Sequence, residues 1–319
     1  MNVDEHLDAE VAAALIASGI DAVVYPADPT GVPEFRRNRV MVSMPIDPAT
    51  TITMRDVSVP SPNGDPDVIV RVYSPPASEQ PRPCCYWIHG GGYIFGTLDM
   101  SDPRCDLFAE TLDCVVVSVD YRLAPEHPFP APVEDCYTGL AWAAAHAAEL
   151  GVDRRRIVIG GQSAGGGLAA GLALMVRDRN EIPVAFQLLI YPMIDDRNTT
   201  VSSHLVTKVW TREANFLGWG CYLGHEPGRA GVSPYAAAAR ADDLRGLPPT
   251  FIGVGTLDVF RDENIDYARR LLEAGVATEL HVYPGAPHGF EGFAPNAAVS
   301  QRFIRDVDDA LRRAMTAVG

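Results

Sequence analysis

The sequence has an excess of acidic over basic residues and no long apolar run. It carries 26 Lys and Arg against 41 Asp and Glu, a formal charge of −15. Such a chain repels phosphate backbones and anionic lipid head groups, so we expect no nucleic-acid partner and no membrane partner. No stretch approaches the roughly 20 apolar residues of a membrane span. The acidic first residues lack the basic head and apolar run of a secretory signal, so the expected location is cytoplasmic.

The cysteines form no recognisable framework. There are six, and no two have the C-x-x-C spacing. Neither a zinc site nor a disulfide scaffold is therefore indicated, and we expect buried free thiols and no metal. The six are Cys84, Cys85, Cys105, Cys114, Cys136 and Cys221.

Length and composition fit one large α/β domain. Of the 319 residues, 47% are hydrophobic and 21% are charged, as in globular rather than disordered chains. Short apolar runs alternate with helical patterns, which predicts a mostly parallel sheet with helices on both faces. The predicted strands are 84–88, 115–119, 157–159, 184–190, 250–254 and 279–283, and the predicted helices are 103–112, 133–150, 164–179, 264–274 and 298–314.

Other segments complete the predicted organisation. Segments 51–59 and 68–73 flank a turn with Asn-Gly and prolines, which predicts an antiparallel hairpin at a sheet edge. About sixty residues separate two of the predicted strands, more than a crossover needs, and their aromatic content predicts an inserted helical lid. The expected division is an N-terminal cap arm (1–50), a first core part (51–194), a cap insertion (195–228) and a second core part (229–319).

The sharpest local signal is Gly-Gln-Ser-Ala-Gly at 161–165, between a predicted strand and a predicted helix. A strand-to-helix turn this tight forces Ser163 into strained backbone angles and points its hydroxyl out of the sheet, at the amino end of a helix. The alternative interpretation is a glycine-rich turn whose serine only caps the helix. Taken alone, the stretch does not decide between nucleophile and cap.

A second signal is His-Gly-Gly-Gly at 89–92, directly after the predicted strand 84–88. Consecutive glycines let backbone N–H groups point inward at close range, as a tetrahedral oxyanion requires. A phosphate-binding loop is the competing interpretation, but no lysine follows the glycines as a P-loop requires. Together with Ser163, this loop predicts acyl-transfer chemistry.

A serine nucleophile needs a base, and the base needs an orienting acid. Of the eight histidines, His288 lies in a loop just past the last predicted strand and is the predicted base. Asp258 is the first carboxylate after strand 250–254 and is the predicted acid. Asp262 and Glu263 remain alternatives, although they fall at a helix start, where carboxylates also serve as caps. The chain order Ser163, Asp258, His288 is that of the α/β hydrolases.

Five ordered motifs extend this pattern over most of the chain. They are His-Gly-Gly-Gly at 89–92, Tyr-Arg-Leu-Ala-Pro-Glu at 121–126, Gly-Gln-Ser-Ala-Gly-Gly at 161–166, Asp-Val-Phe-Arg-Asp-Glu at 258–263 and His-Gly-Phe at 288–290. From about residue 51 to the end, the sequence resembles the hormone-sensitive-lipase-like, or bacterial type IV, carboxylesterases of the α/β-hydrolase fold.

The resemblance implies an α/β-hydrolase fold with a helical cap, oxyanion donors at Gly91, Gly92 and Ala164, and a small-molecule ester as substrate. It implies no cofactor. One residue departs from the family pattern, because Gln162 precedes the nucleophile where the family usually has Asp. The change removes a negative charge beside the developing oxyanion, and we expect hydrolysis to be retained.

The sequence thus predicts a serine carboxylesterase that hydrolyses short- to medium-chain esters through an acyl-enzyme on Ser163. An amidase or peptidase with the same triad, and a non-catalytic small-molecule receptor on this fold, are the alternatives. A homodimer through the edge strand 279–283 is a further expectation. The expected substrate-pocket residues are Trp210, Phe216, Trp219 and Phe290.

Overall fold

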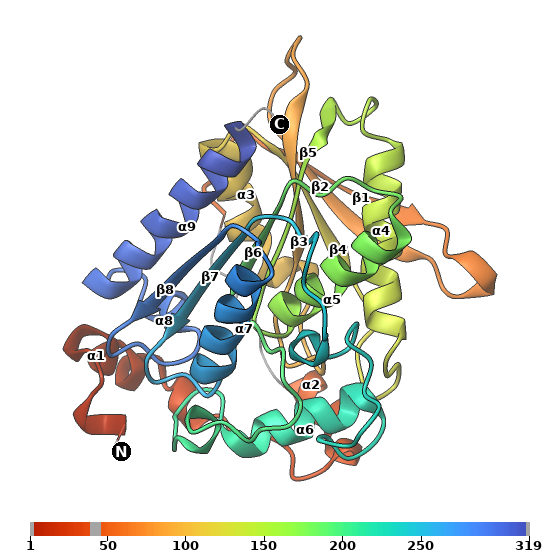
Figure 1. Cartoon of the computed structure of the whole chain (residues 1–319). Helices are drawn as coiled ribbons and strands as arrows, with labels where there is room; N and C mark the ends of the chain where they lie inside the picture. Colours follow the sequence, from red (N-terminus) through yellow and green to blue (C-terminus); the bar gives the residue numbers. More distant parts are fainter. Residues whose placement is uncertain (1–2, 39–45, 317–319) are drawn as a thin grey trace.

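The computed structural model describes residues 3–38 and 46–316, in which eight strands form one sheet in the order β1-β2-β4-β3-β5-β6-β7-β8 (Figure 1). β2 runs antiparallel to β1 and β4, and the other pairings are parallel. The hairpin predicted at a sheet edge is confirmed. The strands are β1 (Thr53–Val59), β2 (Val68–Ser74), β3 (Arg82–Ile88), β4 (Val115–Asp120), β5 (Val152–Gln162), β6 (Phe186–Ile190), β7 (Thr250–Gly255) and β8 (Thr278–Tyr283).

Helices cover both faces of the sheet, as predicted. One face carries α4 (Ala131–Ala145), α5 (Ala164–Arg179) and α7 (Arg261–Glu273), and the other carries α3 (Asp102–Thr111) and α9 (Ala298–Thr316) (Figure 1). The middle strands are buried between these layers, β7 along its whole length. This double burial explains why the central strands read in the sequence as unbroken apolar runs. All six cysteines are buried and free, as expected.

Most element boundaries lie within about three residues of the predicted ones, and two differ by more. β5 begins at Val152 rather than at 157, and α4 ends at Ala145 rather than at 150. The early part of β5 consists of aspartate and arginines, which have low strand propensity. Pairing of Val152 with Arg82 of β3 nevertheless extends the ladder, so the sheet context overrides local preference.

Three further helices lie beyond the carboxyl ends of the parallel strands. α1 (Ala9–Ser18) and α2 (Val32–Asn38) come from the N-terminal arm, and α6 (Arg212–Leu223) comes from the segment between β6 and β7. They gather at the lower end of the molecule in Figure 1. The arm and the insertion are tied together where the Tyr25 hydroxyl donates to the Val209 carbonyl, 3.2 Å away. Both segments therefore cover the sheet end where parallel α/β proteins bind ligands.

The last strand, β8, forms the second edge of the sheet. A homodimer through this edge stays a prediction. None of the helices in the described part of the chain combines the length and hydropathy that a membrane-spanning helix requires.

Candidate active site

Ser163 lies in the turn between β5 and α5. Its φ of 58° and ψ of −122° are strained for a residue with a side chain. Neighbouring backbone holds it there: its amide donates to the Ile190 carbonyl at 2.9 Å, and its own carbonyl accepts from the Met193 amide at 3.0 Å. Glycine at 165 permits the turn, since a Cβ there would lie 2.2 Å from the Ile88 carbonyl oxygen.

The structure brings the three predicted triad residues together. His288 Nε2 lies 2.9 Å from Ser163 Oγ, and His288 Nδ1 lies 2.7 Å from Asp258 Oδ2. Asp258 is fully buried, and its other carboxylate oxygen accepts from the Phe260 amide at 2.9 Å. Ser163 and His288 are each 7% exposed. A carboxylate, an imidazole and a hydroxyl are thus joined in one hydrogen-bonded row.

The two alternative acids point elsewhere. Asp262 accepts from the Ser202 amide at 2.7 Å and pairs with Arg261. Glu263 accepts from the amides of Ile194 and Asp195 at 2.9 and 3.2 Å. Burial raises the pKa of Glu263 well above its ordinary value, and the negative charge of the nearby Asp195 raises it further. Of the three carboxylates, only Asp258 is hydrogen-bonded to the His288 ring.

The glycine loop after β3 lies against the serine. A Cβ on Gly90 would sit 3.3 Å from Ser163 Cβ. Gly91 and Gly92 have positive φ values of 122° and 58°, which favour glycine, and their amides make no hydrogen bond within the part of the chain that the structure describes. Ala164 is the first residue of α5, where helix amides lack an intrahelical partner. These three amides are available to a substrate oxygen.

His89, the residue just before these glycines, fixes the loop through hydrogen bonds and ring stacking. Its Nδ1 donates to the Gly90 carbonyl at 2.8 Å, and its ring stacks on Tyr121 with centroids 4.3 Å apart. The Tyr121 hydroxyl donates to the His89 carbonyl at 3.0 Å. Burial lowers the pKa of His89 to about 4, so the ring is neutral near pH 7.

Because His89 is buried and neutral, we expect the protein to lose stability on acidification. Its pKa falls from an ordinary 6.5 to about 4 in the folded protein, so the unfolded chain takes up the proton first as the pH drops. The free energy of unfolding therefore declines between about pH 6.5 and 4. His89→Asn keeps an N–H donor and does not titrate. Denaturant titrations near pH 7 and near pH 5 should show a smaller acid loss in the variant. Equal losses would contradict the prediction.

Trp210 is the predicted pocket residue that reaches this site. A Cβ on Gly92 would lie 2.1 Å from the Trp210 ring, and the ring centroids of Trp210 and His288 are 6.5 Å apart. The indole Nε1 donates to the Asn215 side chain at 3.2 Å, which fixes the ring. Trp210 thus forms a wall beside the glycine loop and the imidazole.

The other three expected pocket residues do not form this wall. Trp219 is fully buried and packs against Tyr93 and Tyr222. Phe290 is fully buried and packs against Tyr283 and Phe303 in the core under α9. Phe216 is 37% exposed on α6, beneath the Arg212 guanidinium. Aromatic content predicted a lid whose rings line the pocket, but Phe216 faces outward on α6, and the rings of Trp219 and Phe290 lie in the core.

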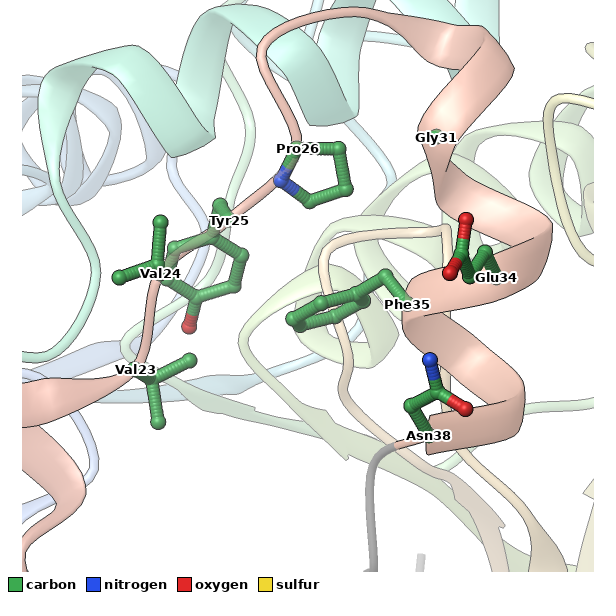
Figure 2. A pocket seen from close by; sticks show the side chains of 8 residues that line it. All are labelled: Val23, Val24, Tyr25, Pro26, Gly31, Glu34, Phe35 and Asn38. Atoms are coloured by element: carbon green, nitrogen blue, oxygen red, sulfur yellow. The ribbon is translucent and has the colours of Figure 1, made fainter.

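A cleft of about 450 Å³ opens in the arm, between the extended residues before α2 and α2 itself. The rings of Tyr25 and Phe35 face it with centroids 5.5 Å apart, and Glu34 and Asn38 project from the helix (Figure 2). Tyr25 also meets Trp210 edge to face at 5.1 Å. A row of aromatic rings therefore runs from the arm to the imidazole.

Gln162, the residue that departs from the family pattern, is partly buried beside the glycine loop. Its Cγ lies 3.3 Å from the position that a Cβ on Gly90 would take. The amide makes no hydrogen bond with any described residue. It therefore adds a neutral polar group next to the glycine loop.

Two aromatic neighbours of His288 were not expected from the sequence. Tyr191 and Phe260 meet the imidazole nearly edge to face, with ring centroids 4.7 and 5.1 Å away. Tyr191 directly follows β6, and Phe260 stands two residues after Asp258. Their positions just past strand ends were the signal that could have identified them.

Comparison with known proteins identifies the family of this chain. The protein family described as alpha/beta hydrolase fold matches residues 85–292. The chain belongs to this α/β-hydrolase family, in its hormone-sensitive-lipase-like group of carboxylesterases. It is 40% identical to Carboxylesterase NlhH of Mycobacterium tuberculosis over 237 residues, 73% of this chain and 74% of that protein. It is 36% identical to Esterase LipI of the same species over 265 residues, 81% of each.

Two solved structures show the likeness over nearly the full length. Bacterial Heroin Esterase superposes with a TM-score of 0.89 at 44% identity, covering 98% of this chain and 99% of that one. A hyperthermophilic esterase from the archaeon Pyrobaculum calidifontis superposes with a TM-score of 0.84 at 32% identity, covering 98% and 100%. The predicted fold is confirmed.

Proposed function

We propose that this protein is a serine carboxylesterase that works through an acyl-enzyme on Ser163. The observation that carries the proposal is the row of hydrogen bonds Ser163–His288–Asp258, 2.9 and 2.7 Å long. Ser163 Oγ attacks the ester carbonyl carbon while His288 Nε2 takes its proton. Asp258 holds the imidazole with its proton on Nδ1 and stabilises the imidazolium that forms.

The glycine loop and the start of α5 supply the hydrogen-bond donors for the negative charge that develops on the substrate. The carbonyl oxygen becomes an oxyanion in the tetrahedral intermediate, and the amides of Gly91, Gly92 and Ala164 donate to it. His288 then protonates the leaving alcohol, which leaves the acyl group on Ser163. A water molecule, deprotonated by His288, attacks the acyl-enzyme and releases the acid.

The surroundings of the triad favour a small-molecule ester of short to medium chain. The arm and the insertion together form the proposed cap, and Trp210 occupies the space beside Gly92. A large ring at that position leaves limited room for a long acyl chain. Relatives named carboxylesterase and esterase support the ester as substrate.

Hydrolysis of p-nitrophenyl esters from acetate to palmitate tests this proposal. We expect kcat/KM to peak at the short or medium acyl chains, because the pocket wall is close to the reacting atoms. A parallel assay with the p-nitroanilides separates esterase from amidase. A maximum at palmitate, or faster cleavage of the anilides, would contradict the proposed function.

Shortening the aromatic wall should change the chain-length profile. Trp210→Ala is expected to raise the kcat/KM ratio of octanoate to acetate by on the order of tenfold, because each added methylene then finds apolar space. Phe216→Ala is the matched control, since this ring lies on the outside of α6 and should leave the ratio unchanged. Equal ratios in wild type and Trp210→Ala would show that Trp210 does not limit the pocket.

A further inference from the structure

Tyr191 connects the segments that carry the three triad residues. The carbonyl of Ile190, just before it, accepts from the Ser163 amide at 2.9 Å, and its own amide donates to the Gly253 carbonyl in β7 at 2.7 Å. Its ring rests against the His288 imidazole at 4.7 Å. Tyr191 is 2% exposed and has a positive φ of 33°. Such a backbone conformation is strained for a residue with a side chain and persists only where its surroundings hold it.

The hydroxyl end of Tyr191 is held as firmly as its backbone. It donates to Glu291 Oε1 at 2.5 Å, and Arg104 of α3 donates to the same oxygen at 2.8 Å. Glu291 lies in the short helix α8 (Phe290–Phe293), three residues after His288, and its side chain is 3% exposed. Burial, followed by the nearby Glu291 charge, raises the pKa of Tyr191 well above its ordinary value. The phenol therefore stays protonated and remains a donor.

The imidazole needs such support because its hydrogen bond to Asp258 fixes only one edge of the ring. A ring bonded through Nδ1 alone can still swing about that bond, and the swing moves Nε2 away from Ser163. Tyr191 and Phe260 both meet the imidazole nearly edge to face, at interplanar angles of 66° and 83°. Of these two rings, only Tyr191 is itself anchored, through its hydroxyl, to the segment that carries His288.

We propose that Tyr191 and Glu291 are positioning residues, and that the phenol–carboxylate hydrogen bond between them holds the His288 ring in line with Ser163. The proposal rests on the proposed function of the triad. It predicts a loss in the chemical step rather than in substrate binding, because neither side chain takes part in the reaction. Misalignment of a catalytic group by about 1 Å costs on the order of a hundredfold in rate, so a partial loosening costs less.

Tyr191→Phe tests the hydroxyl with the ring kept in place. We expect kcat for p-nitrophenyl acetate to fall on the order of tenfold, with KM within about twofold of wild type. Glu291→Ala, which removes the acceptor, should lower kcat at least as much. Glu291→Gln keeps an amide oxygen that can accept from Tyr191 and Arg104, so it should restore most of the rate. This rescue separates hydrogen-bond geometry from the mere presence of a side chain.

Tyr283→Phe is the matched control. Tyr283 is also 2% exposed and donates its hydroxyl to a carboxylate, Asp306, at 2.8 Å, but it packs against Phe290 and Phe303. Each Tyr→Phe variant loses the phenol–carboxylate bond of a buried tyrosine, and both should lower Tm. Only Tyr191→Phe should lower kcat.

Several outcomes would overturn the proposal. One is a kcat that falls equally in Tyr191→Phe and Tyr283→Phe. Another is a rise in KM, in place of a fall in kcat, in Tyr191→Phe. A third is a Glu291→Gln enzyme that is as slow as Glu291→Ala. Should Tyr191→Phe not fold, the Glu291 pair decides by itself. An inactive Ser163→Ala alongside a fully active Tyr191→Phe refutes only the positioning role, whereas an active Ser163→Ala refutes the proposed function.

Discussion

Ser163→Ala is expected to lower kcat for ester hydrolysis by about 10⁴- to 10⁶-fold, because it removes the atom that forms the acyl-enzyme. The loss should be the same for every ester in the series, since the step is common to all of them. Substrate binding should change little, as the glycine loop and Trp210 remain in place. Steady-state rates with p-nitrophenyl butyrate measure the effect, and the wild type alone should show covalent labelling by a fluorophosphonate.

A matched control separates loss of the nucleophile from loss of a buried hydroxyl. Ser300 on α9 is fully buried, and its Oγ has no hydrogen-bond partner among the described residues. Ser300→Ala should therefore keep wild-type kcat and a similar Tm. Activity of Ser163→Ala within about tenfold of wild type would mean that another group is the nucleophile.

Asp258→Asn is expected to lower kcat by about 10⁴-fold while the fold stays intact. In the wild type the carboxylate accepts a hydrogen bond from His288 Nδ1 at 2.7 Å, which keeps the ring proton on Nδ1 and leaves Nε2 free to accept the Ser163 proton. An asparagine amide can donate to Nδ1 instead, which places the ring proton on Nε2, facing Ser163. That tautomer cannot act as a base.

Asp262→Asn is the matched control for Asp258→Asn. It removes a carboxylate four residues away that serves the Ser202 amide and Arg261. We expect kcat close to wild type and a modest loss of stability, because an ion pair with partly exposed partners contributes about 0–1 kcal/mol. A larger loss of kcat in Asp262→Asn than in Asp258→Asn would contradict the assignment of Asp258. Asp262, the alternative that the sequence left open, would then be the acid.

The positions of the triad residues were predictable because each follows the end of a parallel strand. In such a sheet the carboxyl ends lie along one edge, so residues placed there are brought together whatever the length of chain between them. Ser163 follows β5, Asp258 follows β7 and His288 follows β8. Short motifs therefore carried enough information to choose the three residues and the glycine loop.

The lining of the site was less predictable. Trp210, Phe216 and Trp219 stand within ten residues of one another, and their composition alone suggested one aromatic wall. The rotation of α6 turns Phe216 toward solvent and Trp219 into the core, while Trp210 precedes the helix and reaches Gly92. Helix rotation depends on packing against the arm and the sheet, which no local pattern specifies.

The amino-acid sequence by itself determined the fold class, the strand ends that bear the proposed nucleophile, acid and base, and the glycine loop beside them. These follow from local rules, namely hydrophobic period, turn chemistry and the shared edge of parallel strands. Only the tertiary structure showed that Asp258 is hydrogen-bonded to His288, placed the Trp210 ring beside Gly92, and brought Tyr191 and Glu291 into contact across 100 residues. Such contacts depend on which side chains meet in space, and that is set by the packing of the whole chain.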